Sequence, residues 1–251
     1  MKKRIVILLE LFLLFVVLLA PASLITELVP EQDKFQLSGV SGSIWSGTVE
    51  QINLGPINLQ QVDFSPNLLA FFKAKLGFNL TINQGDIIGN LDAEIASEPM
   101  AQSRFDSINL KLDAESLQPL LPLAGTELGG EVKLTDFALA LENKRPQEMQ
   151  GELSWKNAQL GYAGERWQLG DFVAHVSSDE QKGRITAQLA KSDNKLGLQG
   201  KLTLSKDGVL LFVGSISTQI DKALYNGIAL FNDGKPSNGR LPIKFQQKIY
   251  R

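Results

Sequence analysis

The sequence offers few side chains that could carry out catalysis. It has no cysteine and one histidine, His175, which excludes thiolate nucleophiles, Fe–S clusters and two-histidine zinc sites within one chain. Ser43 and Ser46 lie among glycines, but a serine nucleophile would need its base from His175, which sits in the strand-like stretch 172–176. The carboxylates form no close pair, and no phosphate-binding loop motif is present. The sequence therefore predicts a protein that is not an enzyme and needs no cofactor or metal.

Composition points to an ordinary folded protein. The 251 residues are 43% hydrophobic and 21% charged, which excludes wholesale disorder and allows one or two domains. Lys and Arg number 25 against 27 Asp and Glu, a net charge of −2. This balance gives no sign of a basic surface, so no nucleic-acid partner is expected.

The N-terminus predicts a membrane anchor. Lys2, Lys3 and Arg4 precede a run from Ile5 to Ala20 that is apolar except at Glu10. Extended from Ile5 to Ile25, a helix would be about 31 Å long, close to the bilayer's hydrocarbon thickness. The positive-inside rule then places residues 1–4 in the cytoplasm and 26–251 outside it. A cleaved signal peptide is the alternative, because Ala20-Pro21-Ala22 has the small residues of a cleavage site.

The exported part alternates with a period of two residues. Ile108, Leu110, Leu112 and Ala114 are separated by polar residues, a pattern typical of strands with one buried face. Asp207-Gly208 between two apolar runs predicts a hairpin turn. The sequence therefore predicts a mainly β, strongly curved antiparallel meander, groove-like, with an apolar concave face. Further turns are expected at ten glycines that precede a polar–aliphatic pair: Gly42, Gly47, Gly85, Gly89, Gly130, Gly151, Gly183, Gly200, Gly214 and Gly239.

Helices are expected to be few. Residues 65–72 predict one short helix, with Ser65 as its N-cap and Pro66 in its first turn. The stretch from Leu117 to Leu123 contains two prolines and is read as a connector. It divides the β-rich domain 26–251 into two loosely similar halves, about 31–116 and 126–251.

One segment stands out as a candidate site. Residues 37–49 place an aromatic side chain between glycines, and the candidate structural or partner-binding residues are Gly39, Gly42, Ile44, Trp45 and Gly47. In one interpretation Trp45 plugs the end of the sheet while Gly42 and Gly47 let the chain turn around it. In the other, Trp45 forms part of a partner-facing surface.

The layout resembles the type II secretion system protein N family, also called general secretion pathway protein N. The basic start, the single apolar span, the Trp45 segment and Pro66-Asn67-Leu68-Leu69 before alternating strands carry the resemblance. Phe64 stands where a tryptophan is expected. The resemblance implies a non-catalytic accessory component of the inner membrane, with its C-terminal domain in the periplasm. It would contact other components of the machine that exports folded proteins across the outer membrane.

A second hypothesis assigns the protein to lipid handling. The alternation leaves one apolar face along many strands, and few helices are available to cover it. Such a sheet must fold on itself, bind a partner or hold lipid. A similar anchored architecture occurs in AsmA-like periplasmic proteins, which implies a lipid-binding or lipid-transfer groove as the alternative function.

Overall fold

The computed structural model describes residues 12, 15, 16, 18–24, 35–71, 75–96, 102–120, 125–143, 145–230 and 234–249. The chain divides into two compact units, Met1–Ser97 and Glu98–Arg251. This boundary lies before the stretch 117–123 that the sequence suggested as the connector. Of that stretch, residues up to 120 belong to the 3-10 helix η1(Ala114–Leu120) in the second unit.

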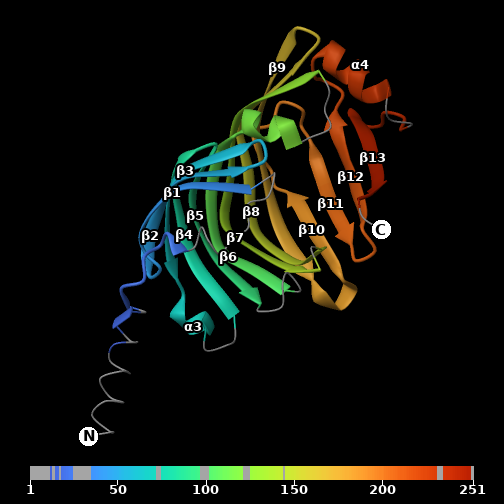
Figure 1. The fold of residues 1–251 in the computed structure, drawn as a ribbon. Helices are drawn as coiled ribbons and strands as arrows, with labels where there is room; N and C mark the ends of the chain where they lie inside the picture. The colour runs from blue at the N-terminus through green and yellow to red at the C-terminus, as the bar shows by residue number, and fades with distance from the viewer. Residues whose placement is uncertain are drawn as a thin grey trace, which may run out of the picture. The chain divides into compact units, whose positions relative to one another are not determined.

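The first unit is an antiparallel meander in which each strand pairs with the next along the chain (Figure 1). Its elements are β1(Phe35–Ser43), β2(Ser46–Leu54), β3(Ile57–Pro66), α3(Leu68–Phe71), β4(Lys75–Gly85) and β5(Ile87–Ala96).

The second unit continues the same plan with longer strands, which bend along their length in Figure 1. Consecutive strands from β6 to β13 pair antiparallel, which confirms the predicted antiparallel meander. The hairpin expected at Asp207-Gly208 joins β11 to β12. The remaining elements are β6(Gln102–Asp113), β7(Thr126–Glu142), β8(Arg145–Tyr162), β9(Glu165–Asp179), η2(Glu180–Lys182), β10(Arg184–Leu189), β11(Gln199–Ser205), β12(Val209–Ser217), α4(Lys222–Leu230) and β13(Arg240–Lys248).

The strand register gathers aliphatic and aromatic side chains on one side of the second unit, here called the apolar face. Residues directly opposite each other in an antiparallel pair share a face, so the register extends across many strands. Half-buried and exposed side chains occur along it, since Leu153 is 38% and Phe245 49% exposed. Its cross-strand rows are Leu112–Val132–Trp155–Phe172, Leu110–Leu134–Leu153–Ala174–Leu189, Val176–Ala187–Leu202–Phe212–Phe245 and Ile216–Leu241.

Cysteine labelling can check this alternation, because the protein has no thiol of its own. Single cysteines at Leu110 and Leu112 should react slowly with a water-soluble maleimide, whereas those at Lys111 and Asp113 should react fast. The first two positions lie on the apolar face, and Lys111 and Asp113 are exposed. The same holds for Ile108, which is 7% exposed. Equal labelling along the run would contradict the register.

Bulges shift the alternation by one residue at several points, which the sequence analysis did not anticipate, and three of them have a non-glycine residue with positive φ. Ser107, Asp136 and Asn157 have positive φ angles of 51°, 45° and 49°. The register shifts beside each of them, in β6, β7 and β8. An extra residue in one strand bends it and increases its twist. This is why the apolar positions of β7 change from Leu134 to Phe137.

Of the ten glycines predicted to mark turns, only Gly183 and Gly239 lie outside strands, and Gly42, Gly47 and Gly85 lie at or beside a strand end next to a turn. The prediction is wrong for the other five. Gly89, Gly130, Gly151, Gly200 and Gly214 lie inside strands. At Gly151, whose φ is +134°, a Cβ atom would lie 2.6 Å from the Cα atom of Phe137. Glycine is needed there because the neighbouring backbone approaches closely.

The predicted helix at residues 65–72 is shorter than expected. Ser65 and Pro66 belong to β3 and pair with Asn79 and Phe78 of β4. The helix α3 begins only at Leu68, so Ser65 is not its cap. Proline is tolerated at the end of a strand, where its missing N–H costs no ladder hydrogen bond.

Most of the predicted membrane span, residues 5–25, lies outside the described residues. Phe12, Phe15, Val16 and Leu18 are helical, but residues 19–23 are not. The expectation of one unbroken helix to Ile25 is therefore wrong at Ala20, because Pro21 disfavours helical backbone at the residue before it and lacks an N–H. Within the part of the chain that the structure describes, no helix is both long and apolar enough to cross a bilayer.

Candidate functional site

The segment around Trp45 forms the hairpin between β1 and β2. Ile44 and Trp45 are the two turn residues, and Ser43 pairs with Ser46 on either side of them. The Oγ atom of Ser43 accepts hydrogen bonds from the backbone N–H groups of Trp45 (3.3 Å) and Ser46 (3.2 Å). This hydroxyl therefore holds the turn closed.

The glycines of the hairpin are required by close contacts. Gly42 has a φ of +89°, and a Cβ atom on it would lie 2.7 Å from the carbonyl oxygen of Ser46. Gly47 pairs with Phe64 of β3, and its Cβ would lie 2.6 Å from the Cζ atom of that ring. Phe64 is 8% exposed. The ring packed over the glycine is thus Phe64, whereas Trp45 is half-buried in the turn.

Gly39 completes the set of candidate residues. It has a φ of +66°, and a Cβ atom on it would meet the side chain of Glu50. Glu50 lies on β2 and its flexible side chain could move aside. The structure therefore brings all five candidate residues into one hairpin, with Gly42 and Gly47 more tightly constrained than Gly39.

The hairpin also binds a short segment near the N-terminus, which the sequence analysis missed. The N–H of Ala22 donates to the carbonyl of Gly42, and the N–H of Ile44 donates to the carbonyl of Ala20. The distance from nitrogen to oxygen is 3.0 Å in both bonds. Pro21 lies opposite Ser43 in an antiparallel bridge, and Ala22 is fully buried. The only local signal was Pro21, which ends a helix but does not indicate its partner.

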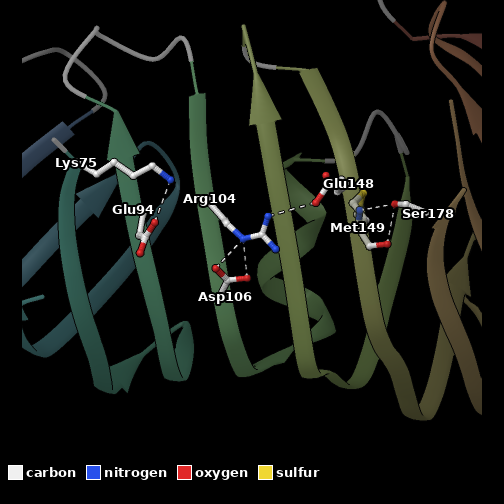
Figure 2. A network of polar contacts seen from close by, with 7 residues as sticks. All are labelled: Lys75, Glu94, Arg104, Asp106, Glu148, Met149 and Ser178. Atoms are coloured by element: carbon white, nitrogen blue, oxygen red, sulfur yellow. Dashed lines mark hydrogen bonds and ion pairs between the residues drawn. The ribbon is translucent and has the colours of Figure 1, made fainter. Parts of the chain in front are cut away.

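Polar side chains also bridge strands, as Figure 2 shows. In the first unit, Lys75 pairs with Glu94 over 3.2 Å. In the second, Arg104 contacts Asp106 at 2.9 Å and Glu148 at 3.2 Å. Asp106, and then Glu148, raise the pKa of the Arg104 guanidinium. The Lys75–Glu94 pair links the neighbouring strands β4 and β5, Arg104–Asp106 lies along β6, and Arg104–Glu148 links β6 to β8.

Arg104 reaches Glu148 across an intervening strand. Ala140 of β7 lies opposite both residues in the register, and its small side chain leaves room for the guanidinium. Beside it, the Oγ atom of Ser178 accepts the N–H of Met149 at 2.6 Å and donates to its carbonyl at 2.9 Å. Both arrangements are structural ties between strands.

Two of the bulges are capped by polar side chains from an adjacent strand. The Oδ1 atom of Asn109 accepts the N–H of Asp136 at 3.0 Å, and Oδ1 of Asp171 accepts the N–H of Asn157 at 2.9 Å. Lys156 donates to the other oxygen of Asp171 at 3.0 Å. These contacts satisfy N–H groups that the bulges remove from the ladder.

The cap at Asp171 predicts a pH dependence. The N–H of Asn157, and then the ammonium of Lys156, lower the pKa of Asp171 below its ordinary 3.8. A carboxyl whose pKa is depressed by folding stabilises the fold above pH 3.8, and this contribution is lost as the pH falls through the lowered pKa. The melting temperature of the wild type should therefore fall more steeply with acidification than that of Asp171→Asn. Parallel curves would contradict the cap.

His175 does not form a catalytic arrangement. It lies on β9, opposite Glu152 and on the side away from the apolar face, with its side chain 61% exposed. Its Nδ1 atom is 3.7 Å from an oxygen of Glu152. Among the described residues, no group of three or more His, Asp or Glu side chains could hold a metal ion.

Comparison with known proteins identifies the family to which the chain is similar. A family model described as "Type II secretion system (T2SS), protein N" matches residues 33–243, a range that begins before β1 and ends within β13. A protein named type II secretion system protein N from Aeromonas hydrophila is 24% identical over 247 residues, 95% of this chain and 94% of its own length. One of the same name from Vibrio cholerae serotype O1 is 23% identical over 190 residues, 73% and 75% of the two chains.

No solved structure is significantly similar to the chain. The family model alone covers well over half of it, including the Trp45 hairpin and parts of both units. The chain therefore belongs to the type II secretion system protein N family.

Proposed function

We propose that the protein is a non-catalytic accessory component of the type II secretion system in the inner membrane. In this proposal residues 1–4 are cytoplasmic, the apolar run after them enters the bilayer, and the β-rich domain acts in the periplasm through contacts with other components. The observation that carries the proposal is the family match across nearly all thirteen strands. The related proteins carry the same system's name.

The N-terminal charge pattern and the antiparallel strands support this topology. Three basic residues precede the apolar run, and such residues stay on the cytoplasmic side. A large antiparallel sheet with polar side chains on one side offers a broad surface for protein contacts. Arg104 and Ser178 form hydrogen bonds between strands on that surface.

A secretion assay tests the proposal. In a Gram-negative host that exports an enzyme through this system, deletion of the gene should lower the enzyme's activity in the culture medium. The missing activity should accumulate in the periplasm, and the wild-type gene should restore export. Unchanged partitioning of the enzyme between medium and periplasm would contradict a role in secretion.

The apolar face favours one alternative, a lipid-binding groove of the AsmA-like kind. Its aliphatic rows continue over the strands of the second unit, and Leu153 and Phe245 remain exposed on it. Phospholipid recovered by solvent extraction from the purified full chain would support this function. Leu202→Asp, on the apolar face, should reduce the recovered lipid, whereas Thr203→Asp, on the opposite side of β11, should not. Equal recovery from both variants would contradict the groove.

A further inference from the structure

The Trp45 hairpin and the segment that docks on it share a lack of charge. No Asp, Glu, Lys or Arg occurs from Phe35 to Val49, or from Leu11 to Leu24, in a chain of which 21% is charged. Paired surface segments of a protein in water usually carry charged residues. The neutrality of both partners indicates that they lie against a surface that charged side chains avoid.

The docked segment also presents apolar side chains outward. Leu18, Leu19 and Leu24 are 52%, 70% and 41% exposed, while Ala22 between them is fully buried. Each of these leucines would gain free energy by leaving water, in proportion to the apolar area that it still exposes. The segment therefore turns Ala22 toward the hairpin and its leucines toward an apolar environment.

Because the helix ends before Pro21, the backbone groups of residues 20–22 need hydrogen-bond partners from another segment. Once the helix ends, its backbone groups need partners, and a bilayer's hydrocarbon supplies none. The hairpin provides them: the carbonyl of Gly42 accepts the N–H of Ala22, and the N–H of Ile44 donates to Ala20. Ala20 is also the last residue of the apolar run that follows the basic N-terminus.

We propose that the Ile44–Trp45 turn inserts into the headgroup region of the phospholipid bilayer that holds the N-terminal segment. The backbone bonds to Ala20 and Ala22 place the turn where the apolar run ends. Tryptophan is enriched at this interface because its ring is apolar and its N–H is polar. The inference rests on the membrane anchoring in the proposed function, and it adds a second, hairpin contact with the bilayer.

Tryptophan fluorescence tests the insertion, since the chain has three tryptophans. The full chain carrying only Trp45 (Trp155→Phe with Trp167→Phe) is reconstituted into phosphatidylethanolamine–phosphatidylglycerol vesicles with bromines near the headgroup end of the acyl chains. The matched control retains only Trp167. We expect the bromines to quench Trp45 about twofold more than Trp167, with a blue-shifted Trp45 emission.

Flotation of the same vesicles separates the two proposals. Chain that floats with the vesicles while Trp45 stays unquenched would overturn the insertion and leave the anchor intact. Chain that does not float would overturn the anchor, and the insertion with it.

A disulfide tests the docking itself. Pro21→Cys with Ser43→Cys places two thiols at a bridge pair, a spacing that permits a disulfide. It should close under mild oxidation in the full chain. The control, Pro21→Cys with Ser38→Cys, moves one thiol about 17 Å along β1 and should stay reduced. A reduced Pro21–Ser43 pair, or equal closure of both, would overturn the docked geometry.

Discussion

Gly42→Ala is expected to destabilise the first unit, Met1–Ser97, by about 3 kcal/mol, which would lower the melting temperature of a unit of this size by about 12–24 °C. Two effects add. The φ of +89° disfavours any residue with a Cβ atom, and that atom would lie 2.7 Å from the carbonyl oxygen of Ser46 and 2.8 Å from the Cα atom of Gly47. Because both contacts are with backbone, no side-chain movement relieves them.

Gly55→Ala is the matched control for this variant. Gly55 lies in the turn between β2 and β3 with a φ of +62°, but a Cβ atom there would have no neighbour within 4 Å. It therefore carries the conformational cost alone, about 1 kcal/mol after the gain from a less flexible unfolded chain. Thermal melts of the full-length variants followed by circular dichroism give the comparison. Equal losses for the two variants would show that the hairpin contacts contribute nothing.

Leu241→Ala should cost the second unit about 2–5 kcal/mol. Leu241 and Ile216 lie opposite each other on β13 and β12, and each is 1% exposed. Truncation of Leu241 leaves a cavity that the paired strands cannot close without breaking their ladder. Chemical denaturation of the purified full chain measures the loss.

Phe245→Ala separates the buried end of the apolar face from its open end. Phe245 shares a strand and a face with Leu241 but is 49% exposed. Its truncation should lower the free energy of unfolding by only about 1 kcal/mol, because about half of its surface is already in water and no closed cavity is left behind. A loss as large as that of Leu241→Ala would mean that something covers the apolar face near β13.

The strands could be predicted because half-burial imposes a period of two on the sequence. Residues 108–113 alternate for this reason, and the structure places successive residues on opposite sides of β6, whereas Ala114 begins η1. The bulges could not be read in the same way, since Ser107, Asp136 and Asn157 are ordinary polar residues that adopt positive φ only under tertiary constraint. The signal available was the slip in apolar spacing from Leu134 to Phe137.

The candidate hairpin was predictable only in part. Gly42 and Gly47 indicated a tight arrangement around Trp45. The close contacts that a Cβ atom would make at each position explain why both residues are glycine. The docking of Ala20 and Ala22 uses backbone groups alone, and backbone hydrogen bonds between distant segments leave no side-chain pattern. Phe64, the ring that packs on Gly47, was noted only as a departure from the family's tryptophan, although an aromatic there fits the space over a glycine.

The sequential order of the strands has a consequence for how the chain folds. Within each unit every strand after the first pairs with the strand just before it. Several of these pairs close only a short loop at little entropic cost, whereas β6–β7, β10–β11 and β12–β13 close longer connections. A chain synthesised from its N-terminus delivers its strands in this same order. Each new strand then meets its partner already formed, and the sheet can grow by single additions without waiting for the C-terminus.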